Sequence, residues 1–249
     1  NTDCRNVAIG YHSLLCNTSG ESNTAIGYNS LDANTTADSN TAVGTCSLTC
    51  NTTGTPNVAI GSSALRDNTE GSNNVAVGRS VLKVSTTASN NTGIGSFSLN
   101  ANTSGSSNVA VGCGSLLTNT EGGSNAAVGT NALTANTTGS SNNAFGSTAL
   151  DNNTTGSSNT AIGNDALDAN TTASDNVAVG NGAMFANTTG CQNTAIGRRA
   201  LNTNITGDNN VAVGFCALKL NTADNNTAVG HDALKTNTTA SNNTAVGFC

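Results

Sequence analysis

The 249-residue sequence predicts an all-β protein, a β-solenoid or β-roll of about fifteen 17-residue coils with one coil per repeat. Three observations carry this prediction. One short unit recurs along the chain, a glycine stands at the same position of every unit, and charged residues are confined to a few positions. Disorder is disfavoured because only 9% of the residues are charged and Pro56 is the single proline.

The repeat is visible in segments of the form Asn-x-Ala-Ile/Val-Gly. They begin at Asn6, Asn23 and Asn40 and continue every 17 residues, with one 16-residue step from Asn210 to Asn226. Numbered from this asparagine, the unit reads N-[TV]-A-[IV]-G-x-x-[AS]-L-x-x-N-T-[TS]-[GA]-x-x. We therefore treat residues 1–249 as a single repeat domain.

Three positions of the unit are nearly constant in a way that indicates their environment. Position 5 is glycine in every repeat, from Gly10 to Gly247, which indicates a positive φ or a backbone approach too close for a Cβ atom. Position 9 is Leu except at Met184, and position 4 is Ile or Val except at Phe145. We expect positions 4 and 9 to form the core.

The distribution of charge is an independent sign that the chain folds. The 8 basic and 14 acidic residues all fall at positions 6, 7, 10, 11 or 14–17 of the unit. Positions 1–5, 8, 9, 12 and 13 never carry a charge. Exclusion of charge from the same positions in every copy indicates that those positions are buried or stacked.

The content of the unit favours strands over helices. Positions 2–4 alternate and end at glycine, as a short strand does, and the segment around Leu predicts a second short strand. Asn-Thr-Thr-Gly is typical of a turn. Coils paired at a spacing of about 4.8 Å would give a rod of roughly 70 Å. Asparagine at position 1 is expected to form a ladder that bonds to neighbouring coils and to the turn backbone.

A coil of this kind has a thin core. It offers two large apolar side chains, each contributing about 1.5–3 kcal/mol when buried, against an ordering entropy of about 1–2 kcal/mol per residue. We therefore expect the chain to associate with copies of itself as a homo-oligomer. Asn1 and Thr2 match the Asn-Thr pair of positions 12 and 13 in residue type, and Phe248 and Cys249 match positions 6 and 7. This pattern is compatible with a head-to-tail fibre and equally with a segment of a longer repeat array.

The strings NVAIG (6–10), NTAIG (23–27) and NVAVG (74–78), which in most repeats precede Ala/Ser-Leu, carry a family resemblance. They resemble the head repeats of trimeric autotransporter adhesins of the YadA-like group, and related repeats of phage tail-fibre-like proteins. The resemblance covers nearly the whole chain. It implies a left-handed β-roll in each chain, three chains side by side, and a role in adhesion at a surface, with a host receptor or surface glycans as partners.

The sequence contains no pattern typical of catalysis. His12 and His231 are far apart and lack a recurring carboxylate or cysteine neighbour, and no phosphate-binding loop or zinc spacing occurs. We predict no enzymatic activity, no cofactor and no metal site. A net charge of −6 argues against a nucleic-acid partner, and no apolar run is long enough to span a membrane.

Position 12 carries a row of sequons for N-linked glycosylation. If they are used, a line of glycans would run along the coils. Position 12 is also Asn where the sequon fails, as at Asn68 and Asn119, which favours an inward ladder instead. The candidate residues are Asn17, Asn34, Asn51, Asn102, Asn136, Asn153, Asn170, Asn187, Asn204 and Asn237.

Eight cysteines without metal-type spacing favour an oxidising compartment, and hence an extracellular or cell-surface location. Cysteines that share a repeat position lie at least two coils apart, which is too far for a direct bridge. Cys46 and Cys50, within one coil, are the local disulfide candidate. Cys4 and Cys249 are candidates for bridges between chains.

Taken together, the sequence predicts a structural protein, an extracellular fibre or adhesin shaft that assembles with itself. The alternative is a surface-binding solenoid that binds ice or glycans. Ice binding rests on the threonine file at position 13, which runs from Thr18 to Thr238 and is broken only by Ile205.

Overall fold

The computed structural model describes residues 5–249 and confirms the predicted β-solenoid. Among these residues, each repeat contributes one three-residue strand followed by turns, and no helix occurs. The chain consists of two compact units, Asn1–Ser124 and Asn125–Cys249, and each is described by itself.

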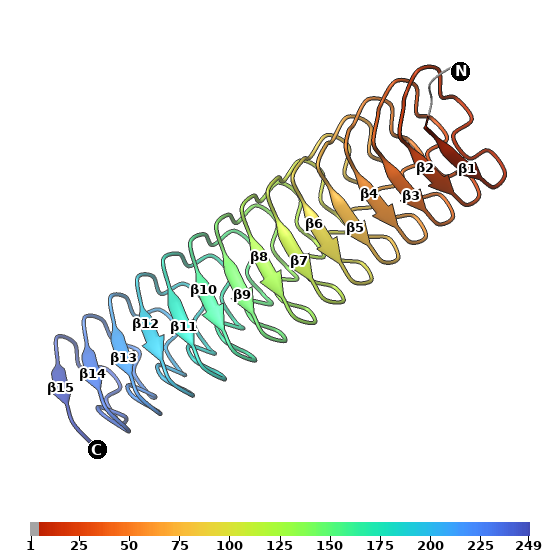
Figure 1. Ribbon diagram of the computed structural model, residues 1–249. Helices are drawn as coiled ribbons and strands as arrows, with labels where there is room; N and C mark the ends of the chain where they lie inside the picture. Colours follow the sequence, from red (N-terminus) through yellow and green to blue (C-terminus); the bar gives the residue numbers. More distant parts are fainter. Residues whose placement is uncertain (1–4) are drawn as a thin grey trace. The chain divides into compact units, whose positions relative to one another are not determined.

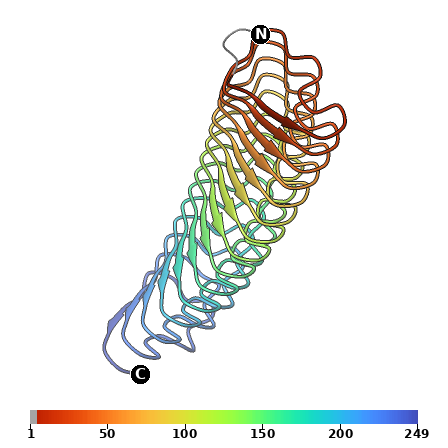
Figure 2. The same ribbon diagram turned by 45° about the vertical axis from the view of Figure 1, so that its right-hand side comes forward.

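The strands of each unit pair in parallel and in sequence order, each one coil after the last (Figures 1 and 2). The register joins identical repeat positions, as in Ala25 with Ala42. It also survives the 16-residue repeat, where Val211 pairs with Thr227, so the missing residue is absorbed in a turn. The first unit holds β1 (Val7–Ile9), β2 (Thr24–Ile26), β3 (Thr41–Val43), β4 (Val58–Ile60), β5 (Val75–Val77), β6 (Thr92–Ile94) and β7 (Val109–Val111). The second holds β8 (Ala126–Val128), β9 (Asn143–Phe145), β10 (Thr160–Ile162), β11 (Val177–Val179), β12 (Thr194–Ile196), β13 (Val211–Val213), β14 (Thr227–Val229) and β15 (Thr244–Val246).

The core lies at positions 3, 8 and 9, and the expectation for position 4 was wrong. Leucines such as Leu31 and Leu167 are fully buried, as are most of the alanines at position 3, for example Ala25. A three-residue strand turns only its middle residue inward, because successive side chains point to opposite faces. The Ile or Val at position 4 therefore points outward together with position 2, and Ile162, for example, is 42% exposed.

The second predicted strand is also absent from the coils of residues 5–249, because the segment around Leu is a turn. Position 9 adopts left-handed φ values of 48–56° in every complete coil, Leu or Met alike. This conformation costs an L residue about 1–2 kcal/mol, which the burial of the leucine side chain, about 1.5–3 kcal/mol, offsets. Inter-coil hydrogen bonds continue through the turn: the Leu31 N–H donates to the Ser47 carbonyl at 3.0 Å, and the Ala33 N–H to the Thr49 carbonyl at 3.0 Å.

One departure from the repeat shows how tightly the interior is filled. Position 3 is Ala in every described repeat except at Gly93, and position 8 is Ala or Ser except at Val81 in the preceding coil. A Cβ atom on Gly93 would lie 2.4 Å from Cγ1 of Val81. The two exceptions compensate each other, because the larger Val81 occupies the space that an alanine would need.

Glycine is required at position 5 for both reasons that the sequence suggested. These glycines have φ values between 117° and 144°. In Gly163 an added Cβ atom would also lie 2.7 Å from the carbonyl carbon of Gly180 in the next coil. Backbone therefore approaches backbone where no side chain fits.

We expect Gly163→Ala to lower the free energy of unfolding by about 2–4 kcal/mol, because it combines a strained φ with a backbone clash. Gly182→Ala is the matched control: its φ is +61° and an added Cβ would meet nothing closer than 3.6 Å. Chemical denaturation of both variants measures the difference. Equal effects of the two substitutions would contradict this account of position 5.

Candidate functional site

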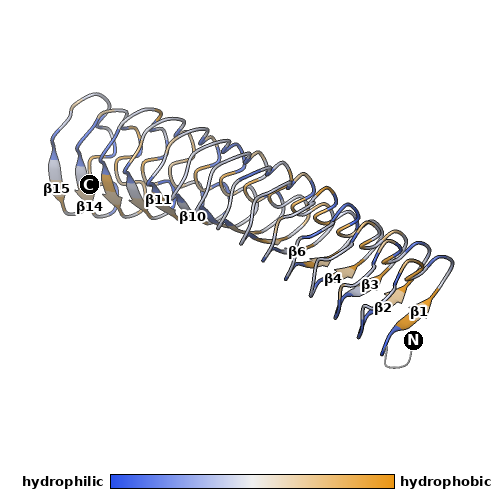
Figure 3. Cartoon of the chain, turned by 90° about the horizontal axis from the view of Figure 1, so that it is seen from above, coloured by the Kyte–Doolittle hydropathy of each residue, from blue (hydrophilic) through white to orange (hydrophobic). Residues whose placement is uncertain are grey.

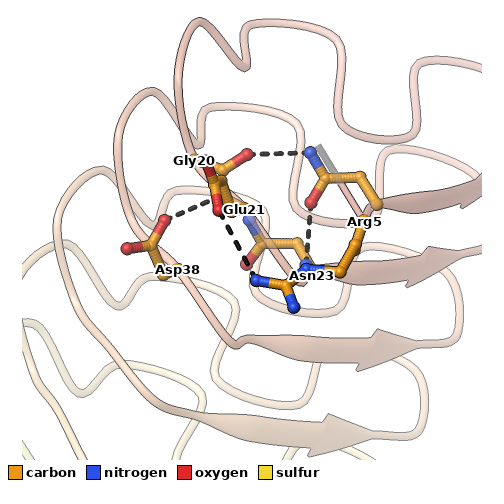
Figure 4. Close-up of polar contacts among 6 residues, drawn as sticks. Arg5, Gly20, Glu21, Asn23 and Asp38 are labelled. Atoms are coloured by element: carbon orange, nitrogen blue, oxygen red, sulfur yellow. Dashed lines mark hydrogen bonds and ion pairs between the residues drawn. The ribbon is translucent and has the colours of Figure 1, made fainter. Parts of the chain in front are cut away.

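The asparagine at position 1 forms the predicted ladder inside the coil. The Asn23 N–H donates to the side-chain oxygen of Asn6 at 2.8 Å, and the Asn40 N–H donates to that of Asn23 at 2.9 Å. The amide nitrogen of Asn6 donates across the coil to the Gly20 carbonyl at 2.8 Å, part of the network drawn in Figure 4. Each asparagine thus ties its own coil together and holds the next coil in register.

The sequon asparagines at position 12 form a second ladder. In all ten candidates the side-chain nitrogen donates to the carbonyl of position 15, three residues later, at 2.8–3.1 Å. In most coils it also donates to the asparagine of the previous coil, as Asn34 does to the side-chain oxygen of Asn17 at 2.9 Å. All the candidates except Asn17 and Asn237 are fully buried.

This geometry favours the ladder role of position 12 over glycan attachment. N-linked glycans are attached to the amide nitrogen, which here is hydrogen-bonded and, in most coils, inaccessible. A glycan on Asn102 or Asn153 would require the turn to open and the ladder to break. Glycosylation of these residues stays a prediction, to be tested by intact mass.

The position 12 ladder is interrupted at Ser85. In other coils the side-chain oxygen accepts the amide of the following coil, as Asn51 accepts from Asn68 at 2.8 Å. Ser85 is buried, and its side chain is too short to reach the side-chain oxygen of Asn68. The Asn68 oxygen and the Ser85 hydroxyl therefore have no hydrogen-bond partner. The side-chain oxygen of Asn204, next to the shortened repeat, is unsatisfied as well.

We expect Ser85→Asn to raise the free energy of unfolding by about 1–3 kcal/mol, because it supplies the missing donor to a buried oxygen. Chemical denaturation measures the change. Ser63→Asn is the control, since it makes the same substitution in a half-buried turn position outside the ladder. A destabilised Ser85→Asn variant would show that the ladder is not what limits stability here.

Most of the threonines at position 13 donate a hydrogen bond from the side-chain hydroxyl to a backbone carbonyl of the next coil. The Thr18 hydroxyl donates to the Thr35 carbonyl of the next coil at 2.9 Å, and Thr154 donates to the Thr171 carbonyl at 3.0 Å. The file therefore stabilises the stacking of the turns. This contact favours a structural role for these hydroxyls, and ice binding stays a prediction.

The disulfide candidates are unpaired where the structure describes them. Cys46, Cys50 and Cys249 carry free thiols, and Cys4 lies outside the described residues. Burial, with a further contribution from the carboxylate of Asp67, raises the pKa of the Cys50 thiol. The pairing of Cys46 with Cys50, and of Cys4 with Cys249, stays a prediction.

Position 10 places carboxylates in adjacent coils of the second unit. Burial raises the pKa of Asp168, and the nearby charges of Asp151 and Asp165 raise it further. The folded chain therefore binds this proton more tightly than the unfolded chain does. The destabilisation by the charged form is present at neutral pH and disappears as the pH falls below the ordinary value of 3.8.

We expect Asp168→Asn to stabilise the protein slightly at neutral pH and to have no effect near pH 3.5, at the acid limit of the linkage. Denaturation midpoints measured across this range test the sign. Glu121→Gln is the control, because its side chain is exposed. A gain that persists unchanged at acid pH would refute the electrostatic explanation.

The surface feature that recurs in every coil is the outward strand face, which we define as the first and third residues of the strands β1–β15. It carries no charged residue and consists mostly of Val, Ile and Thr. Its large side chains are half-buried or exposed, and Phe145, Ile162 and Ile196 are each 42% exposed. Strand β1 appears in the apolar colour in Figure 3. This face was not predicted from the sequence, because position 4 was expected to lie in the core.

Two further features would bear on a functional assignment of residues 5–249: a membrane-spanning helix and a cluster of metal-ligating side chains. This part of the chain has no helix with the length and apolarity to cross a bilayer. It also has no group of three or more His, Cys, Asp or Glu side chains placed to hold a metal ion. Comparison of the chain with models of protein families, with curated proteins and with solved structures gives no match.

Proposed function

We propose that the chain is a structural repeat protein of the extracellular space, the shaft of a fibre or adhesin, and that it associates with copies of itself through the outward strand face. The observation that carries the proposal is this face: in-register rows of uncharged, mostly β-branched side chains, half-buried or exposed, on parallel strands. Large exposed apolar surfaces on soluble proteins are typical of interaction sites.

A second copy is the partner that fits the face best. Its side-chain rows repeat at the same strand spacing of about 4.8 Å, so the rows of one sheet can lie between the rows of the other. The absence of charge means that two identical faces meet without repulsion. A partner recognised by charge would find no complementary group on this face.

The size of the face indicates how strong such association should be. The eight strands of the second unit, with three residues of about 3.3 Å each and a spacing of about 4.8 Å, offer roughly 400 Å² in projection. A standard stable interface buries about 800 Å² on each partner. We therefore expect self-association that depends on protein concentration and strengthens when more coils take part.

The extracellular location and the adhesin role rest on sequence features. Eight cysteines without metal-ligand spacing suit an oxidising compartment, and the Asn-x-Ala-Ile/Val-Gly strings resemble adhesin head repeats. The constant interior and uncharged strand face also suit a protein whose role is reach and stiffness.

The test introduces charge on the outward strand face. Ile162→Lys together with Ile196→Lys places two cations where side chains would meet, and we expect the wild-type oligomer to dissociate to monomers. Sedimentation velocity over a range of concentrations, under reducing conditions, measures the change. Non-reducing intact mass of the wild type tests for disulfides and glycans in the same preparation.

Thr172→Lys together with Thr189→Lys is the matched control. These residues occupy position 14 of neighbouring coils and are exposed, and position 14 carries a charge naturally in Glu70 and Glu121. The control should associate like the wild type. The proposal would be contradicted if the wild type stayed monomeric at every concentration. It would also be contradicted if the control variant dissociated as much as the Ile162→Lys, Ile196→Lys variant.

A further inference from the structure

A hollow of about 280 Å³ opens on the turn surface of the second unit. It is lined by Asp165, Asn181, Gly182, Phe185, Arg199 and Asn202, which come from three consecutive coils. The hollow exists because the row of stacked side chains at position 7 is interrupted by a glycine. Asp165 and Arg199 occupy this position in the flanking coils, and between them Gly182 has no side chain.

The polar groups around the hollow are held in place yet keep free hydrogen-bonding capacity. The Asn202 amide nitrogen donates to the Gly182 carbonyl at 2.8 Å, which leaves its side-chain oxygen available. One carboxylate oxygen of Asp165 accepts from the Thr148 hydroxyl at 2.6 Å, and the other is available. The Arg199 side chain is exposed and forms no ion pair with any described residue.

Phe185 supplies an apolar wall beside these groups. Its side chain is 42% exposed, although the other residues at position 10 are mostly polar or charged. An exposed ring next to fixed donors and acceptors presents an apolar surface and directional hydrogen bonds to the same ligand.

The charges limit the kind of ligand. An anion such as phosphate would meet the carboxylate of Asp165, and a metal cation would meet the guanidinium of Arg199. A neutral ligand with many hydroxyl groups satisfies both, because a hydroxyl donates to a carboxylate or amide oxygen and accepts from a guanidinium. A volume near the lower end for ligand sites suits one small ring.

We propose that this hollow binds the pyranose ring of a sugar, as found at the end of a surface glycan. The apolar face of the ring stacks on Phe185. Its hydroxyl groups bond to Asp165, Arg199 and Asn202. This assignment goes beyond the structural role proposed above and does not depend on self-association.

Saturation-transfer NMR with methyl glucoside, methyl galactoside and N-acetylglucosamine tests the proposal on the full chain. We expect transfer to the ring protons of at least one sugar. Phe185→Ala should weaken binding about tenfold, the value of one aromatic contact. Gly182→Asn should abolish it by filling the hollow. That variant should fold, because Asn29 and Asn131 occupy the same position with φ values of 51° and 55°.

Two control variants separate the hollow from general surface effects. Phe145→Ala removes a ring that is equally exposed but lies on the outward strand face. Ser63→Asn adds an asparagine at position 7 in the first unit. Both should bind like the wild type. The proposal is overturned if no sugar shows transfer, if Gly182→Asn binds normally, or if glycine as a zwitterionic probe binds in place of the sugars.

Discussion

The coil depends on the hydrogen bonds that the backbone carbonyl group of position 15 accepts. It accepts hydrogen bonds from both asparagine amides of its own coil, as the Gly54 carbonyl does from Asn40 and Asn51, each at 3.0 Å. The oxygen atoms of these amides then bond to a neighbouring coil. One cluster of three groups therefore closes each turn of the solenoid and fixes its stacking.

This arrangement explains how a chain with so little apolar bulk can keep a defined structure. Each coil buries one Leu or Met together with small residues, so packing alone contributes little. Buried amides that are fully hydrogen-bonded specify one register, whereas a partly bonded network is costly. Ser85 illustrates the cost, because a single short side chain leaves the Asn68 oxygen without a donor. Regularity is thus a physical requirement of this interior.

Much of the fold could be predicted from the sequence because the repeat itself exposes the constraints. Gly163 and its equivalents indicated a close backbone approach, and Asn23 and its equivalents indicated a ladder. The two errors share one origin: the Ile or Val at position 4 and the Leu at position 9 were both given to strands that face inward. A nearly constant alanine between two residues that are mostly larger and β-branched was the missed signal, since only the residue facing a crowded interior must be small. The left-handed φ of Leu167 has no counterpart in residue preferences and is imposed by the coil.

The same constancy divides the chain into a scaffold and a variable surface. Positions 1, 3, 5, 9 and 12 are held by the interior, whereas positions 6, 7 and 10 change from coil to coil because the interior places no demand on them. Recognition that differs along the chain therefore resides at variable positions such as these. The hollow at Gly182 follows from this division. Gly182 has no side chain between those of Asp165 and Arg199, and this creates a recess that neighbouring coils lack. The backbone of position 7 keeps the same left-handed conformation with or without a side chain. The uniform outward strand face, by contrast, can provide association but no distinction between one coil and the next.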